Sequence, residues 1–88
     1  MTGPTAAPGA LHPRVLLLGR AGCHLCDEAR VVVADVCSGL GQAWAYQDVD
    51  DHPHLRERYS DLVPVVLVDG ADVAHYRVSS AVLRAALG

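Results

Sequence analysis

The 88-residue chain contains 51% hydrophobic and 19% charged residues, a globular balance that excludes an intrinsically disordered protein. Its formal net charge of −3, with seven arginines and no lysine, excludes nucleic acid and an anionic membrane as primary partners. A chain of this length has room for one domain.

The first 13 residues predict a flexible tail, because they are rich in proline, glycine, alanine and threonine. They lack the basic and apolar regions of a signal peptide. No apolar run in the chain approaches the roughly 20 residues that span a bilayer. We therefore expect a cytoplasmic protein, in which thiols stay reduced, with one folded domain over residues 14–88.

The first half of the chain predicts two strands around one long helix. Val15–Leu18 is apolar without alternation, which favours a strand buried on both faces. Apolar residues then recur at helical spacing over Leu25–Leu40, and glycines end that pattern. Residues 43–49 predict a second strand, with Trp44 and Tyr46 as core aromatics on one face.

The second half predicts a short helix, a hairpin and a last helix. The elements are a helix over 53–59, a strand over 65–68, a turn over 69–72, a strand over 73–76, and a helix capped by Ser79 or Ser80. The predicted order is βαβαββα. This order indicates an α/β fold, with a four-stranded mixed sheet flanked by helices.

The stretch GRAGCHLC places two cysteines where the first strand meets the first helix. Cys23 is expected near the helix N-cap, where free N–H groups and the helix dipole favour a thiolate. Cys26 lies three residues on, within reach of a mixed disulfide at Cys23. Arg20 adds a nearby cation, whereas Asp27 and Glu28 raise a thiol pKa. We expect the helix N-terminus and Arg20 to prevail.

A proline stands directly before the third predicted strand, in Leu62–Val65, where it can carry a cis peptide bond. Together with strand-Cys-x-x-Cys-helix and the Asp48–Asp50 strand end, this Val63-Pro64 pair resembles the glutaredoxin branch of the thioredoxin superfamily. The similarity is closest to the small bacterial glutaredoxin-like proteins and spans about residues 14–88. It implies a thioredoxin-like fold.

The resemblance also implies roles for particular residues. Cys23 attacks a substrate disulfide and Cys26 resolves the mixed disulfide. Val63 and Pro64 face the active-site pair and align a substrate backbone, and Arg20 matches the basic residue that meets a glutathione carboxylate. The implied substrates are protein or low-molecular-weight disulfides. The chain is expected to act as a monomer with no bound cofactor, with glutathione or another low-molecular-weight thiol as reductant.

The chain departs from the glutaredoxin pattern at several contacts. His24-Leu25 replaces Pro-Tyr between the cysteines, and Leu62 replaces a threonine. Ala74-His75 and Arg77-Val78 stand where the family has Gly-Gly and an aspartate that contact glutathione. The resemblance therefore carries over the fold and the dithiol chemistry more fully than a glutathione site.

His24 and Leu25 are candidate substrate contacts by their position between the cysteines. A charged His24 imidazole would also lower the pKa of the Cys23 thiol. The other interpretation of His24 is an exposed residue without a role, and the sequence leaves both open.

Cys37 is the third cysteine. In a regular helix it lies roughly 16 Å along the axis from Cys26, whereas a disulfide needs Cα atoms within about 7 Å. We expect Cys37 to be a small buried hydrophobic residue.

Two other functions use the same cysteine pair. A soft-metal carrier for Cu(I) or zinc would exploit the two thiolates. Small copper chaperones share the strand-Cys-x-x-Cys-helix start but follow the order βαββαβ, so a terminal strand over 79–87 would support that function. A zinc site lacks a convincing second Cys/His pair. A non-catalytic redox adaptor is the third hypothesis, and dithiol exchange is the favoured one.

Overall fold

The structure, a computed structural model, describes residues 13–88, so the predicted flexible tail lies outside it except for Pro13. The elements follow in the order β2 (Val15–Gly19), α2 (His24–Leu40), β3 (Trp44–Asp48), the 3-10 turn η1 (Val49–Asp51), α3 (Pro53–Tyr59), β4 (Val65–Val68), β5 (Ala71–His75) and α4 (Ser80–Leu87). The predicted order βαβαββα is confirmed, with η1 inserted before α3.

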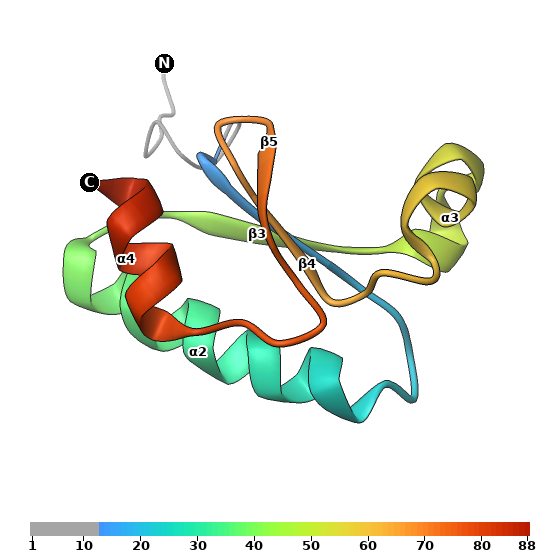
Figure 1. The fold of residues 1–88 in the computed structure, drawn as a ribbon, viewed down its shortest axis with the longest axis horizontal. Helices are drawn as coiled ribbons and strands as arrows, with labels where there is room; N and C mark the ends of the chain where they lie inside the picture. The colour runs from blue at the N-terminus through green and yellow to red at the C-terminus, as the bar shows by residue number, and fades with distance from the viewer. Residues whose placement is uncertain (1–12) are drawn as a thin grey trace, which may run out of the picture.

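The four strands form one mixed sheet in the order β3-β2-β4-β5 (Figure 1). β2 runs parallel to β3, while β4 is antiparallel to both of its neighbours. In the parallel pair, Leu17 lies opposite Tyr46 and Gly19 lies opposite Asp48. The mixed four-stranded sheet predicted from the sequence is therefore confirmed.

Both faces of the sheet are covered, which explains the unbroken apolar run of β2. Alternate residues of β2 point to opposite faces. On one face Val15 and Leu17 pack with buried residues of α2 and with Leu83 of α4, and Trp44 and Tyr46 pack against this cluster. On the other face Leu18 packs with Tyr59 of α3. The sheet lies between the α2–α4 layer and α3 (Figure 1).

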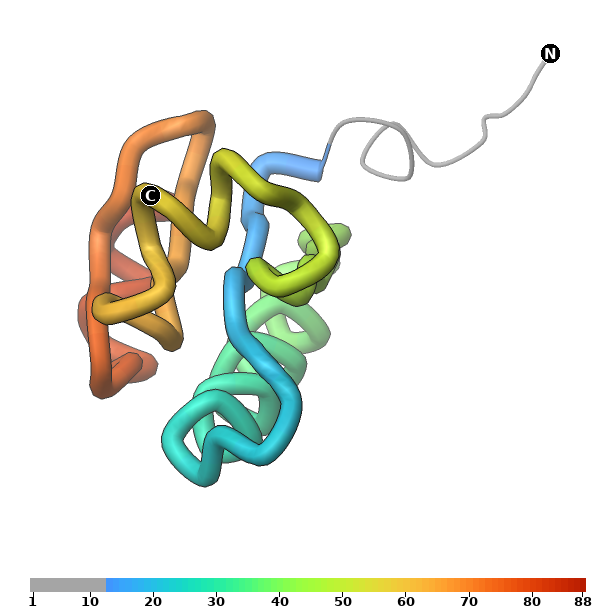
Figure 2. The backbone as a smooth tube through the Cα atoms, turned by 90° about the vertical axis from the view of Figure 1, so that its right-hand side faces the viewer, coloured from blue at the N-terminus to red at the C-terminus, as the bar shows by residue number. Residues whose placement is uncertain are grey.

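The start of α2 and the helix α3 lie on the same side of the molecule, which faces the viewer in Figure 2. The loop after β2 leads to that end of α2 (Figure 2). The two cysteines of the Cys-x-x-Cys motif are therefore presented on this side.

The final hairpin is tighter than predicted. Only Asp69 and Gly70 form the turn, with φ angles of 53° and 87°, so β5 begins at Ala71 instead of Val73 and ends at His75. A two-residue turn with positive φ at both central residues has a twist that matches that of the flanking strands, and the Asp-Gly sequence favours this turn. Arg14 donates two hydrogen bonds, of 3.0 and 2.9 Å, to the Asp69 carboxylate.

Side-chain caps fix two further element starts. The backbone N–H of Val82 donates to Ser79 Oγ at 3.1 Å, so Ser79 and not Ser80 caps α4. Asp48 accepts from the N–H of Asp50 at 2.8 Å and caps η1.

The predictions for Cys37 and for membrane-spanning segments can be compared with the described residues. Cys37 is fully buried on α2, as predicted, and burial raises the pKa of its thiol. Within residues 13–88, none of the helices combines the length and the hydropathy that a membrane crossing requires.

Candidate active site

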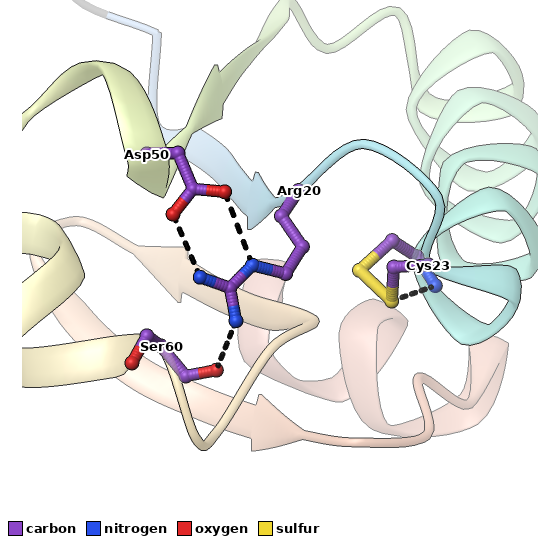
Figure 3. The surroundings of a disulfide bond; sticks show 5 residues. Arg20, Cys23, Asp50 and Ser60 are labelled. Carbon is purple, nitrogen blue, oxygen red and sulfur yellow. Dashed lines mark hydrogen bonds and ion pairs between the residues drawn. A yellow bond between two sulfur atoms is a disulfide. The ribbon is translucent and has the colours of Figure 1, made fainter.

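Cys23 and Cys26 lie at the start of α2 and form a disulfide, with their Cα atoms 5.1 Å apart. Cys23 is the N-cap residue, and its Sγ accepts a hydrogen bond of 3.1 Å from the backbone N–H of Cys26 (Figure 3). Cys23 is half-buried, whereas Cys26 is only 1% exposed. A thiol or thiolate from outside can therefore reach Cys23 more readily than Cys26.

Arg20 lies at the start of the loop that leads to Cys23, and its guanidinium donates three hydrogen bonds to Asp50 and Ser60. Its Nη2 and Nε donate to the two carboxylate oxygens of Asp50 at 2.7 and 3.2 Å, and its Nη1 donates to the backbone oxygen of Ser60 at 3.3 Å. Figure 3 shows the guanidinium turned toward Asp50 and Ser60. The hydrogen bonds from Arg20 hold the pKa of the Asp50 carboxyl below its ordinary value.

The two residues between the cysteines differ in exposure. The side chain of His24 is 87% exposed, and its Nε2 lies 3.0 Å from a carboxylate oxygen of Glu28, one turn along α2. Leu25 is half-buried. His24 thus faces solvent beside a carboxylate, whereas Leu25 is partly covered by other parts of the chain.

The segment before β4 contains the predicted Val63-Pro64 pair, and the bond between them is cis. Pro64 is buried. The N–H of Tyr76 donates to the backbone oxygens of Pro64 and Leu62, at 2.9 and 3.3 Å. Among residues 13–88, neither the N–H nor the C=O of Val63 takes part in a backbone hydrogen bond.

A cavity of about 220 Å³ adjoins the cysteine helix. One wall comes from the first turns of α2 and the other from the segment between β5 and α4. Its lining residues are Leu25, Glu28, Ala29, Val32, Tyr76, Arg77, Val78 and Ser79. Leu25, between the two cysteines, thus lines a cavity that has apolar side chains together with one carboxylate, of Glu28, and one guanidinium, of Arg77.

Two residues near the cysteines were not predicted as part of the site. A Cβ atom built on Gly19 would lie 2.9 Å from the Tyr46 hydroxyl oxygen and 3.2 Å from the Cys26 Cβ. Gly19 is buried at the end of β2. A glycine inside a buried strand indicates a close approach of another group to the backbone, but the predicted strand ended at Leu18 and so did not include Gly19.

Comparison with known proteins agrees with this arrangement. The family model described as Glutaredoxin-like domain (DUF836) matches residues 14–88. An uncharacterized protein of Mycobacterium tuberculosis is 38% identical over 78 residues, which cover 83% of this chain and 80% of that protein.

Solved structures give the same assignment of fold. A structural-genomics target protein from X. campestris has a TM-score of 0.69 at 30% identity, over 83% of this chain and 93% of that chain. The glutaredoxin from Archaeoglobus fulgidus has a TM-score of 0.61 at 14% identity, over 98% of both chains, a likeness of fold alone. The predicted thioredoxin-like fold and the resemblance to glutaredoxin-like proteins are confirmed.

Proposed function

We propose that this chain, which belongs to the Glutaredoxin-like domain (DUF836) family, is a dithiol thiol–disulfide oxidoreductase. The observation that carries the proposal is the unequal placement of the two sulfurs. Cys23 is half-buried at the N-cap of α2 and its Sγ accepts a hydrogen bond from the Cys26 N–H, whereas Cys26 is 1% exposed. Free N–H groups and the dipole at a helix N-terminus stabilise a thiolate at Cys23.

The reaction begins when the Cys23 thiolate attacks one sulfur of a substrate disulfide. The substrate S–S bond breaks, and its electron pair leaves on the other sulfur as a thiolate. Cys26 then gives its proton to water and attacks Cys23 Sγ, which releases the second substrate sulfur as a thiolate. Two molecules of a low-molecular-weight thiol such as glutathione reduce the Cys23–Cys26 disulfide by the same steps in reverse.

The free backbone of Val63 supports the alignment of an extended substrate. The N–H of Tyr76 donates to the carbonyls of Leu62 and Pro64, the residues on either side of Val63. Among the described residues, the N–H and C=O of Val63 have no backbone hydrogen-bond partner. An extended segment of a substrate protein can pair with these two groups as one strand pairs with another. We infer that Val63-Pro64 holds the substrate beside Cys23.

The cavity beside Leu25 supports a side-chain pocket for the same substrate. Its volume of about 220 Å³ is smaller than that of pockets for drug-sized ligands, which start at about 300 Å³. Val32 and Val78 line it together with Leu25. A pocket of this size and lining fits one apolar side chain of a substrate protein.

The soft-metal alternative receives less support. The chain ends in α4, not in the terminal strand over 79–87 that the copper-chaperone order requires.

The test is a turnover assay with insulin disulfides, in which dithiothreitol is the reductant. Cys23→Ser should abolish the catalysed reduction. Cys26→Ser, reduced and then freed of dithiothreitol before substrate is added, should accumulate a mixed disulfide with substrate that intact-mass spectrometry detects. Cys37→Ala is the matched control and should retain activity, because Cys37 is buried away from the pair. Undiminished turnover by Cys23→Ser would contradict the proposal. A native chain that reduces neither insulin nor a small disulfide would favour the adaptor.

A further inference from the structure

Tyr46 reaches from β3 to the buried half of the cysteine pair. Its backbone lies opposite Leu17 of β2, and its side chain packs on the face of the sheet that α2 covers. The Tyr46 hydroxyl oxygen and the Cys26 Cβ lie within 3.2 Å of one point, the place where a Cβ of residue 19 would be. Because Gly19 has no side chain, the phenol and Cys26 share the space above its backbone.

The phenol ring is held from the same helix that carries the cysteines. The guanidinium carbon of Arg30, one turn beyond Cys26, lies 4.0 Å from the centre of the Tyr46 ring. Burial, together with the Asp48 carboxylate, raises the pKa of Tyr46. The hydroxyl therefore keeps its proton at neutral pH and can donate a hydrogen bond. Among residues 13–88, it has no hydrogen-bond partner within the chain.

The two cysteines differ in the donors around them. Cys23 has the helix N-terminus and the N–H of Cys26. Cys26 is 1% exposed, and its own N–H is directed to Cys23. Burial in apolar surroundings disfavours a thiolate. The resolving cysteine therefore needs a donor from elsewhere in the fold.

We propose that the Tyr46 hydroxyl donates a hydrogen bond to the Cys26 sulfur when the pair is reduced, and so stabilises the thiolate that resolves the mixed disulfide. This role rests on the proposed function. In the resolving step the Cys26 proton goes to water, and the new Cys26–Cys23 bond replaces the bond between Cys23 and the substrate. The departing electron pair stays on the substrate sulfur. Tyr46 keeps its proton throughout, so it is a positioning residue.

The experiment titrates Cys26 as the only thiol, in a Cys23→Ser, Cys37→Ala background, by thiolate absorbance or by alkylation rate against pH. Adding Tyr46→Phe keeps the ring and removes the hydroxyl. A hydrogen bond from the Tyr46 hydroxyl would stabilise the Cys26 thiolate, so Tyr46→Phe should lower the Cys26 thiolate fraction at neutral pH about ten-fold. An unchanged Cys26 titration in Tyr46→Phe overturns the proposal.

Tyr59→Phe is the matched control. Like the partly buried Tyr46, Tyr59 packs against the core with an arginine at its ring, the Arg58 guanidinium carbon lying 5.2 Å from the ring centre, but it belongs to the cluster on the opposite face of the sheet. Tyr59→Phe should leave the Cys26 titration unchanged. An effect equal to that of Tyr46→Phe would show a general loss of packing and overturn the proposal.

A second measurement uses the unmodified chain and so does not depend on the folding of any variant. In the reduced protein, the carbon-13 signal of the Tyr46 ring carbon bearing the hydroxyl should follow the ionisation of Cys26, and that of Tyr59 should not. A Tyr46 signal that ignores Cys26 overturns the proposal. Neither titration needs a substrate. Failure of the native chain to turn over disulfides would therefore defeat the proposed function without altering the Tyr46 result.

Discussion

Arg20 and Asp50 form a two-point ion pair, with nitrogen–oxygen distances of 2.7 and 3.2 Å (Figure 3). Arg20 lies three residues before Cys23, and Asp50 lies in η1, directly after β3. The same guanidinium donates to the carbonyl of Ser60, the residue that follows α3. The pair therefore fastens the loop that leads to Cys23 to the η1–α3 segment.

This ion pair should make stability depend on pH in the acid range. Arg20 holds the folded-state pKa of Asp50 below its ordinary value, so the contribution is complete above the unfolded carboxyl pKa of about 3.9. It is lost as the pH falls through the lowered folded-state pKa. Asp50→Asn should therefore lower the Tm slightly at neutral pH, and the difference should vanish in acid. Thermal unfolding over this pH range measures it.

Asp51→Asn provides the control, because Asp51 is exposed in the same turn and forms no ion pair among the described residues. Its Tm should match that of the native chain at every pH. If Asp50→Asn and Asp51→Asn have the same Tm at neutral pH, Arg20 and Asp50 do not stabilise the loop.

In the reduced protein, Cys23 should be alkylated faster than Cys26 and Cys37. The helix N-terminus stabilises its thiolate, so Cys23 should react well below the free-thiol pKa of about 8.5. The buried Cys37, whose pKa is raised by desolvation, should react slowest. Alkylation against pH, with each cysteine located by peptide mass spectrometry, measures the three profiles. A Cys23 midpoint at the free-thiol value would remove the physical basis of the exchange mechanism.

Leu25→Asp should weaken the reduction of a protein disulfide. Leu25 lines the cavity beside the cysteines, and a charge there is incompatible with an apolar substrate side chain. We expect kcat/KM for insulin disulfides to fall about ten-fold, with less effect on a small disulfide that does not fill the cavity. Val31→Asp, at a position of α2 that is 69% exposed, should leave both rates unchanged. Equal losses for the two variants would argue against a substrate pocket at Leu25.

The elements that were predicted depend on local patterns. The unbroken apolar runs of β2 and β4 and the helical spacing of α2 are strong signals within a few residues of sequence. The cysteine pair and Val63-Pro64 came from short motifs. The shorter turn at Asp69-Gly70 and the 3-10 turn η1 differ from prediction by a few residues, because boundaries are decided by backbone angles and caps.

The contacts that were not predicted depend on strand register. Arg20 and Asp50 are 30 residues apart, and they meet because parallel pairing places Gly19 beside Asp48. Gly19 permits a close approach to the backbone at the end of β2, but only the pairing of β2 with β3 identifies Tyr46 as the side chain that approaches. Such long-range placement is not encoded in any one segment.

Gly19→Ala tests that packing directly. The added methyl group would lie 2.9 Å from the Tyr46 hydroxyl oxygen, 3.0 Å from a ring carbon and 3.2 Å from the Cys26 Cβ, so the phenol must move. Overpacking of this kind costs about 1–3 kcal/mol in the free energy of unfolding. Chemical denaturation of the oxidised protein measures it.

Gly39→Ala is the matched control and should have the opposite sign. Apart from the chain neighbours and the local helix backbone, no atom lies within 4 Å of a Cβ built on Gly39, which is inside α2. Alanine should therefore stabilise the helix, by about 0.5–1 kcal/mol. Combining Gly19→Ala with Tyr46→Phe removes the closest of the three contacts, so the double variant should be more stable than the two separate losses predict. Strictly additive losses, or a Gly19→Ala protein as stable as the native chain, would mean that Tyr46 does not occupy the space between Gly19 and Cys26.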